Sequence, residues 1–222
     1  TIMAGGVPVT ITTEQKDNFK LTAEKLREKI TPCSKLLVLP YPNNPTGAIM
    51  KREDLEEIAQ VIKETNIVIV SDEIYSELTY DGTHCSIAEI EGMRERTVVI
   101  NGFSKSFAMT GWRLGFLGGP KEIVSQMLKL HQYAIMSSPT VSQYAAIVAM
   151  HSCQKDIDAM RNEYNIRRRF VVDSFNKLGL KCFAPQGAFY VFPCIKSTGM
   201  TSTDFCEKLV YTKKVAVVPG DA

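Results

Sequence analysis

Residues 101–116, NGFSKSFAMTGWRLGF, carry the side chains of this chain that are best suited to covalent chemistry. The segment begins where the apolar run 97–100 stops and ends in the apolar run 114–117. Lys105 is the candidate reactive group, because a lysine beside a strand end can lose its solvation, and burial then lowers its pKa. A neutral lysine amine condenses with aldehydes to give a Schiff base. The residue types therefore point to carbonyl chemistry at Lys105.

The polar groups around Lys105 suit a bound anion. Arg113 can make charge-assisted hydrogen bonds to a phosphate, and hydroxyls from Ser104, Ser106 and Thr110 can add to them. The alternative is an ordinary solvated loop, which is the more frequent origin of a lone Ser-Lys pair. The motif becomes informative only together with residues at other strand ends, where open α/β sheets place their ligands.

The segment PYPNNPTG, residues 40–47, follows the apolar run 36–39. Its three prolines and its glycine predict a stiff turn. Such a turn holds the amide of Asn44 at the carboxyl end of the predicted strand. The alternative is that Asn43 and Asn44 only hydrogen-bond their own turn, and on its own this segment favours that alternative.

The apolar run 67–70 leads into SDEIY, which places Asp72 at the carboxyl end of a strand and Tyr75 three residues later. If the backbone turns helically there, the carboxylate and the phenol come within reach of one ligand. The alternative is an N-cap aspartate beside a packed tyrosine. Asparagine at one strand end, aspartate and tyrosine at the next, and Ser-Lys at a third form a combination that chance rarely produces.

Apolar runs alternate with helical patterns along the chain, which predicts a mostly parallel α/β sheet covered on both faces. In the segment 52–65, residues 55, 58, 59 and 62 are apolar, at the spacing of one helix face. The expected strands are 6–11, 36–39, 67–70 and 98–100. The expected helices are 22–30 with Thr22 as N-cap, 52–65, from Pro120 to about 133, 139–150 and 155–178.

The C-terminal part of the sequence predicts a smaller α+β unit. Residues 181–195 are expected to form a hairpin that turns at residues 185–187. Its aromatic residues alternate as in a core, although Tyr190 could also face a ligand. A helix over 203–211 and a strand over 215–218 complete the unit.

The composition excludes several classes of protein. A length of 222 residues suits one large domain or one domain and part of another. The net charge of +2 indicates no nucleic-acid surface, and the run Arg167–Arg169 is expected to lie on a solvated helix face. No apolar run approaches the ~20 residues of a membrane span, and the first residues show no signal peptide. Six scattered cysteines without a CxxC pair favour reduced thiols in the cytosol and no metal site.

Three segments together resemble the class I and II aminotransferases, which are pyridoxal 5′-phosphate (PLP) enzymes of fold type I. They are NNPTG at 43–47, DEIY at 72–75 and SKSFAMTGWRLGF at 104–116. Further similarity lies in FKLTAEKL near the start, APQGAFYVFP at 184–193 and VAVVPG at the end, so the resemblance covers nearly the whole chain. It is nearest to the branch with aromatic, aspartate and N-acetyl-diaminopimelate aminotransferases. It implies a three-layer α/β/α fold and transfer of an amino group between an L-amino acid and a 2-oxo acid.

The resemblance also implies a role for each candidate residue. Lys105 forms the Schiff base with PLP and, once the substrate releases it, moves a proton at the substrate. Asp72 pairs with the pyridinium nitrogen and keeps it protonated, so that the ring can drain charge from the substrate carbon. Tyr75 and Asn44 hydrogen-bond the phenolic oxygen of the cofactor.

The resemblance assigns the phosphate to Ser104 and Arg113, yet other parts of the family's site are absent from the sequence. A Gly-rich phosphate segment, the ring that stacks on PLP and a tyrosine borrowed from the second subunit normally precede residue 1. The arginine for the substrate carboxylate normally follows residue 222. We therefore expect a piece of a homodimeric, cytoplasmic enzyme. Residues 1–160 belong to the PLP-binding large domain, whose N-terminal part is missing, and residues 161–222 to part of the small domain, including the linking helix.

Two other functions stay open at the level of sequence. Another fold type I PLP enzyme, such as a carbon–sulfur β-lyase, uses the same cofactor residues. An aminotransferase-like effector domain of a transcription regulator binds PLP only as a ligand. A nicotinamide dehydrogenase is disfavoured, because no GxGxxG follows a predicted strand.

Overall fold

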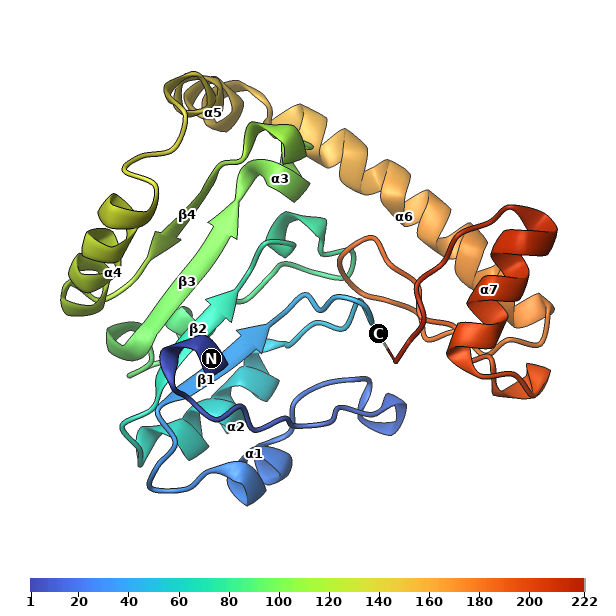
Figure 1. Cartoon of the computed structure of the whole chain (residues 1–222), viewed down its shortest axis with the longest axis horizontal. Coiled ribbons are helices and arrows are strands. Elements are labelled where there is room, and N and C mark those ends of the chain that lie inside the picture. Colours follow the sequence, from blue (N-terminus) through green and yellow to red (C-terminus); the bar gives the residue numbers. More distant parts are fainter. Residues whose placement is uncertain (222) are drawn as a thin grey trace.

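A four-stranded sheet forms the centre of the computed structural model, which describes residues 1–221 (Figure 1). The strands are β1 (Leu36–Pro40), β2 (Val68–Asp72), β3 (Thr97–Gly102) and β4 (Gly115–Gly118), in that spatial order. The first three strands are parallel, and β4 is antiparallel to β3. The predicted α/β class with a mostly parallel sheet is confirmed.

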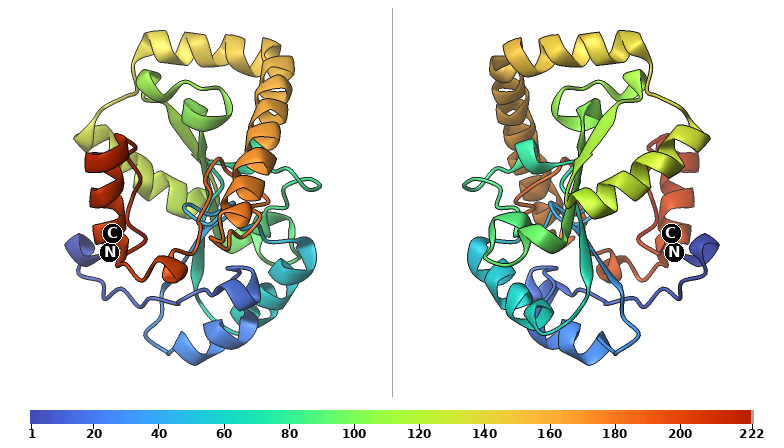
Figure 2. Two further views of the ribbon diagram at one scale, coloured as in Figure 1. Left: turned by 90° about the vertical axis from the view of Figure 1, so that its right-hand side faces the viewer. Right: turned by 90° about the vertical axis from the view of Figure 1, so that its left-hand side faces the viewer.

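Helices lie on both sides of this sheet, with α2 and α4 on opposite sides (Figure 2). In chain order the α-helices are α1 (Ala23–Lys29), α2 (Arg52–Lys63), α3 (Phe103–Ser106), α4 (Lys121–Ala134), α5 (Thr140–Ser152), α6 (Gln154–Lys177) and α7 (Ser202–Lys213). The helix α6 leads away from the sheet toward α7 (Figure 1). Over residues 1–221, no helix has both the length and the apolar character that a membrane span requires.

The main core lies between the helices α1 and α2 and one face of β1 and β2. Leu55, Ile58 and Ile62 of α2 are buried there, as their spacing predicts. At the start of α1, the side chain of Thr22 accepts a hydrogen bond from the Lys25 N–H at 3.3 Å, which confirms the predicted N-cap. This core supports the strands from one side of the sheet.

The opposite face of β1 is open, since Leu36 is 53% exposed and Val38 is 54% exposed. The predicted strands 6–11 and 215–218 are wrong, because the structure contains no strand in either segment. Neither segment has a neighbouring strand in the described part of the chain, and a strand needs such a neighbour to satisfy its backbone groups. Apolar and β-branched residues are therefore an insufficient guide at these two positions.

The predicted hairpin over residues 181–195 is also wrong, because the segment contains an isolated bridge between Cys182 and Pro193 and no regular strand. The segment docks instead on the turn after β1. The carbonyl of Gly47 accepts hydrogen bonds from the backbone N–H groups of Gln186, at 2.8 Å, and Gly187, at 2.9 Å. Backbone contacts to another part of the chain thus replace the expected ladder.

Arg168 and Tyr80 hold the docked segment from the side of α6. The Arg168 guanidinium lies 5.0 Å from the centroid of the Tyr80 ring and donates a hydrogen bond to the Pro185 carbonyl. The Tyr80 hydroxyl donates to the Ala188 carbonyl. The expected solvated face therefore holds for Arg167 and Arg169 of the basic run and is wrong for Arg168, which is partly buried.

Alanine at Gly47 is predicted to displace the docked segment. Gly47 has a φ of 70°, and an added Cβ would lie 2.2 Å from the Cβ of Pro185. Gly82 is a matched control, because its φ is 82° but a Cβ there would meet nothing within 4 Å. We expect Gly82→Ala to lower the free energy of unfolding by about 1 kcal/mol from backbone strain, and Gly47→Ala to lower it by several-fold more. Urea denaturation of the two variants measures the difference, and equal losses would contradict the close docking.

Candidate active site

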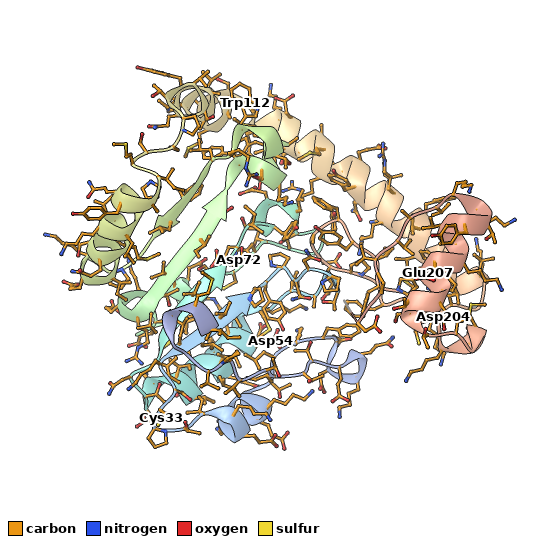
Figure 3. The ribbon with its side chains drawn as sticks, in the orientation of Figure 1. Cys33, Asp54, Asp72, Trp112, Asp204 and Glu207 are labelled. Carbon is orange, nitrogen blue, oxygen red and sulfur yellow. The ribbon has the colours of Figure 1, made fainter. Side chains whose placement is uncertain are left out.

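The three strand ends that carry the candidate residues lie side by side. In the parallel register Pro40 pairs with Asp72, and Asp72 pairs with Ile100. The turn that contains Asn44 follows β1, Asp72 ends β2 at the centre of the sheet (Figure 3), and Lys105 follows β3 on α3. The structure thus brings the predicted residues to one edge of the sheet.

Lys105 lies beside two aromatic rings that pack on each other. Its Nζ is 5.8 Å from the centroid of the Tyr75 ring and 5.7 Å from that of Phe189. Within residues 1–221, it forms no ion pair with a carboxylate. The helix α3 can turn directly after β3 because Gly102 approaches Gly115 of β4, where a Cβ would lie 3.0 Å from the Gly115 Cα. The lysine amine is therefore placed at a strand end with no charged partner.

Tyr75 is the buried phenol of the site, with 5% of its surface exposed. Its hydroxyl lies 2.6 Å from the hydroxyl of Tyr190, and its ring packs edge-on against Phe189, with 5.4 Å between the centroids. Burial raises the pKa of Tyr75, and the hydrogen bond with Tyr190 and the charge of Asp72 raise it further. Tyr75 is consequently a neutral hydrogen-bonding group beside the lysine.

Asp72 uses one of its two carboxylate oxygens within the chain. Oδ1 accepts a hydrogen bond from the Ile74 N–H at 3.2 Å, which is the capping role that the sequence also allows. Oδ2 has no hydrogen-bond donor in the described part of the chain. A carboxylate oxygen with free capacity at this edge can bind a protonated nitrogen by a charge-assisted hydrogen bond.

The two asparagines after β1 differ in what they bind. Asn43 holds the turn, since its Oδ1 accepts from the Thr46 N–H at 3.3 Å and from the Thr46 hydroxyl at 2.8 Å, while its Nδ2 donates to the Pro40 carbonyl. Asn44 is exposed, and its side chain makes no hydrogen bond with residues 1–221. The turn-forming alternative thus describes Asn43, and the amide of Asn44 stays available for a ligand.

Ser104 and Arg113 are connected through Thr110. The Thr110 hydroxyl donates to the Ser104 carbonyl at 3.0 Å, and Nη1 of Arg113 donates to the Thr110 carbonyl at 3.0 Å. Ala108 and Arg113 both have a φ of 53°, a conformation that residues other than glycine seldom adopt and that concentrates at functional sites. Arg113 is exposed, and its other N–H groups face no partner within residues 1–221. The loop can therefore present a guanidinium and a hydroxyl to an anion, whereas Ser106 is buried away from its surface.

Glu73 is a buried carboxylate that the sequence reasoning missed. It accepts hydrogen bonds from the hydroxyls of Ser71, at 2.8 Å, and Ser86, and its Oε2 lies 2.8 Å from Nε2 of His84. Burial alone would raise the pKa of Glu73, but the hydrogen bonds from His84 and Ser86 and the interaction with the imidazole lower it overall. Glu73 thus ties the end of β2 to the segment 84–86. The sequence around DEIY gives no indication that Glu73 binds His84 and Ser86.

Phe189 was expected only as a core residue, yet its ring forms one wall beside Lys105. Tyr190, which the sequence allowed to face a ligand, contacts the site through Tyr75. Both depend on the docking of residues 185–188 on Gly47, a long-range contact that local patterns do not encode. The site therefore combines a lysine amine, a carboxylate, a phenol, an amide and a guanidinium loop, which suit a ligand with a carbonyl, a cationic nitrogen and an anionic group.

Comparison with known proteins gives a consistent family. The profile described as "Aminotransferase class I and II" matches residues 2–222. A putative aminotransferase of Bacillus subtilis is 48% identical over 218 residues, which are 98% of this chain and 56% of that protein. An aspartate aminotransferase of Pyrococcus abyssi is 45% identical over 224 residues, which are 100% of this chain and 58% of that protein.

Solved structures agree with the sequence relatives. An aromatic aminotransferase from Pyrococcus horikoshii superposes with a TM-score of 0.96 at 44% identity, covering 99% of this chain and 60% of that one. An aspartate aminotransferase from Thermus thermophilus with maleate gives a TM-score of 0.94 at 37% identity, covering 99% and 58%. The chain therefore spans somewhat more than half the length of the relatives that it matches.

The ionisation of Glu73 is predicted to make folding sensitive to acid. Because its pKa in the folded state lies below the ordinary value of 4.5, its contribution to stability is present above that value and is lost as the pH falls through the folded-state pKa. Glu73→Gln should cost about 1–3 kcal/mol of the free energy of unfolding at pH 7, and the difference from wild type should shrink below pH ~4.5. Urea unfolding at pH 7 and pH 3.5 measures this, with exposed Glu57→Gln on α2 as the control. A difference that stays constant with pH would show that the Glu73 charge is unimportant.

Proposed function

The chain belongs to the class I and II aminotransferases, and from this membership we propose that it is part of a longer enzyme that moves an amino group between an L-amino acid and a 2-oxo acid. We call this longer protein the parent enzyme. Members of the family use PLP as their cofactor. The observation that carries the proposal is the position of Lys105 Nζ at a strand end, without an ion pair among residues 1–221 and 5.7 Å from Phe189 and 5.8 Å from Tyr75.

The free groups of the site fit PLP in number and in chemistry. The cofactor offers an aldehyde, a pyridine nitrogen, a phenolic oxygen and a phosphate. The matching groups are the Lys105 amine, the free oxygen of Asp72, the Tyr75 hydroxyl with the exposed Asn44 amide, and the exposed guanidinium of Arg113 with the Ser104 hydroxyl. These groups gather at one edge of the sheet with free hydrogen-bonding capacity, which is the arrangement expected of a ligand site.

When bound, PLP supplies a carbonyl that captures amines and a protonated ring that accepts the electron pair released at the substrate α-carbon. Asp72 keeps a positive charge at the ring nitrogen through its carboxylate. With PLP bound, Lys105 Nζ would take a proton from the substrate α-carbon and deliver it to the cofactor carbon that had carried the aldehyde. Neutral, solvent-exposed side chains would perform the ionic pairing and the proton transfer poorly.

The remaining residues orient the cofactor. Tyr75 and the Nδ2 group of Asn44 donate hydrogen bonds to the phenolic oxygen. Arg113 and Ser104 anchor the phosphate, so that the ring keeps its place while Lys105 is exchanged for the substrate amine. The left-handed backbone conformation of Arg113 supports this role, because strained conformations of this kind concentrate at ligand-binding sites.

The similar relatives are named for aspartate, aromatic amino acids and N-acetyl-LL-diaminopimelate, at comparable identities of 45–47%. We therefore limit the proposed donor to the class of L-amino acids. We further propose that residues 1–160 form most of a PLP-binding domain and residues 161–222 part of a smaller one, with α6 as the connection. A cytoplasmic homodimer is proposed for the parent enzyme from the family resemblance.

Addition of an amino donor without acceptor tests the reaction. We expect the parent enzyme to convert bound PLP to pyridoxamine 5′-phosphate in one stoichiometric turn, measured by absorbance during a screen of L-amino acids. Release of pyruvate, ammonia and sulfide from L-cysteine, with PLP unchanged, would select the carbon–sulfur lyase. Binding of PLP without any change on adding donors would select the effector domain.

Replacement of Asp72 tests the role of the carboxylate. Asp72→Asn keeps an oxygen that can accept from the Ile74 N–H but loses the charge, so the folded state should be retained. In the parent enzyme kcat should fall by several powers of ten, at about 1.4 kcal/mol for each tenfold. Exposed Asp81→Asn is the control for loss of a nearby negative charge. A wild-type kcat in Asp72→Asn, with unchanged circular dichroism, would limit Asp72 to capping the turn.

A further inference from the structure

Tyr190 reaches the site from the docked C-terminal segment rather than from a strand end. Its hydroxyl lies 2.6 Å from that of Tyr75, and either oxygen can be the donor. For the Tyr75 hydroxyl this is the single hydrogen bond within residues 1–221. Because Tyr75 is 5% exposed, water cannot readily replace Tyr190 as its partner.

The position of Tyr190 is set by hydrogen bonds to the backbone of the preceding residues and by ring packing. The Gly47 carbonyl holds Gln186 and Gly187, and the Tyr80 hydroxyl binds the Ala188 carbonyl. Its ring also packs on that of Phe189, with 4.9 Å between the centroids. These contacts fix the backbone and the ring next to Tyr190, and its hydroxyl is therefore held toward Tyr75.

The direction of the hydrogen bond decides what Tyr75 can do, because each phenol has one proton. Without a ligand, Tyr75 can donate to Tyr190. An anionic phenolic oxygen beside Lys105 is a stronger acceptor than a tyrosine hydroxyl, since charge-assisted hydrogen bonds are roughly twice as strong. Tyr75 then donates to the anion, and its own oxygen is free to accept from Tyr190. A phenol that accepts a hydrogen bond is polarised into a better donor.

We propose that Tyr190 is a positioning residue that donates to the Tyr75 oxygen and so directs the Tyr75 proton at the phenolic oxygen of bound PLP. The inference rests on the proposed function, since it requires PLP at Lys105. Tyr190 itself touches neither the cofactor nor the substrate in this role. It links the docked C-terminal segment to the electronic state of the cofactor.

The other titratable groups near Tyr75 limit the effect that Tyr190 has on the titration. Asp72 approaches from the end of β2, and Lys105 approaches from α3. Tyr164 of α6 lies behind Phe189, with 5.3 Å between the two ring centroids, and does not contact the Tyr75 hydroxyl. Replacement of Tyr190 by phenylalanine changes none of these charges, so a shift in that variant reports on the hydroxyl pair.

The test is the pH dependence of the visible absorbance of the PLP-loaded parent enzyme. Hydrogen-bond donors to the phenolic oxygen of PLP stabilise its anion. They therefore lower the pH at the midpoint of the titration in which the Lys105 nitrogen bonded to PLP loses its proton. Tyr190→Phe should therefore raise the midpoint by about 0.3–1 pH unit, the size expected for weakening one hydrogen bond. Tyr75→Phe should raise it more, and adding Tyr190→Phe to that variant should change nothing further.

Tyr164→Phe is the matched control, because it removes a hydroxyl from a ring that packs on Phe189 without contacting the Tyr75 hydroxyl. Its midpoint should equal that of wild type. An equal shift in Tyr164→Phe, or an unchanged midpoint in Tyr190→Phe beside a normal wild-type band, overturns the role of Tyr190 and leaves the proposed function intact. A wild-type parent enzyme with no visible PLP band overturns both.

Discussion

The hydrogen bonds that the Gly47 carbonyl accepts from Gln186 and Gly187 are the constraint on which the site depends. They bring a segment from the C-terminal part of the chain onto the turn after β1. Without them Lys105 would end a strand that faces open solvent on this side. With them, the Phe189 ring lies 5.7 Å from its amine, beside the Tyr75 ring at 5.8 Å. The absence of a Cβ at Gly47 allows this contact, since a Cβ there would lie 2.2 Å from the Cβ of Pro185.

Electrostatics then divides the site into polar groups that serve the fold and polar groups that stay free. Glu73, Asn43 and one oxygen of Asp72 are satisfied by neighbouring residues and hold the strand ends in place. Lys105, Arg113 and the second oxygen of Asp72 have no charged partner in the described structure. Asp72 suits a cationic nitrogen of a ligand and Arg113 an anionic group, while the Lys105 amine can react with a carbonyl. The division explains how one edge of a sheet can be both stable and open to chemistry.

The sequence predicted the elements whose apolar spacing repeats and whose partners are adjacent in the sheet. The helix α2 and the strands β1–β3 follow from such patterns, and so does the arrival of Asp72 and Lys105 at one edge. The segments 6–11 and 215–218 have the composition of strands but no neighbour, and a strand depends on its neighbour as much as on its residues. Arg168 looked like part of a solvated run, yet it stacks on Tyr80, because the partner comes from another part of the chain. The contact of Tyr190 with Tyr75 joins two parts of the chain that are 115 residues apart, for the same reason.

The central claim is that Lys105 is the residue that binds PLP covalently, and one measurement tests it most directly. The PLP-loaded parent enzyme is reduced with borohydride, digested, and its labelled peptide is identified by mass spectrometry. We expect a phosphopyridoxyl group on the lysine of the segment NGFSKSF, residues 101–107, and its loss in Lys105→Ala. A label on any other lysine, or an unchanged label in Lys105→Ala, would contradict the account.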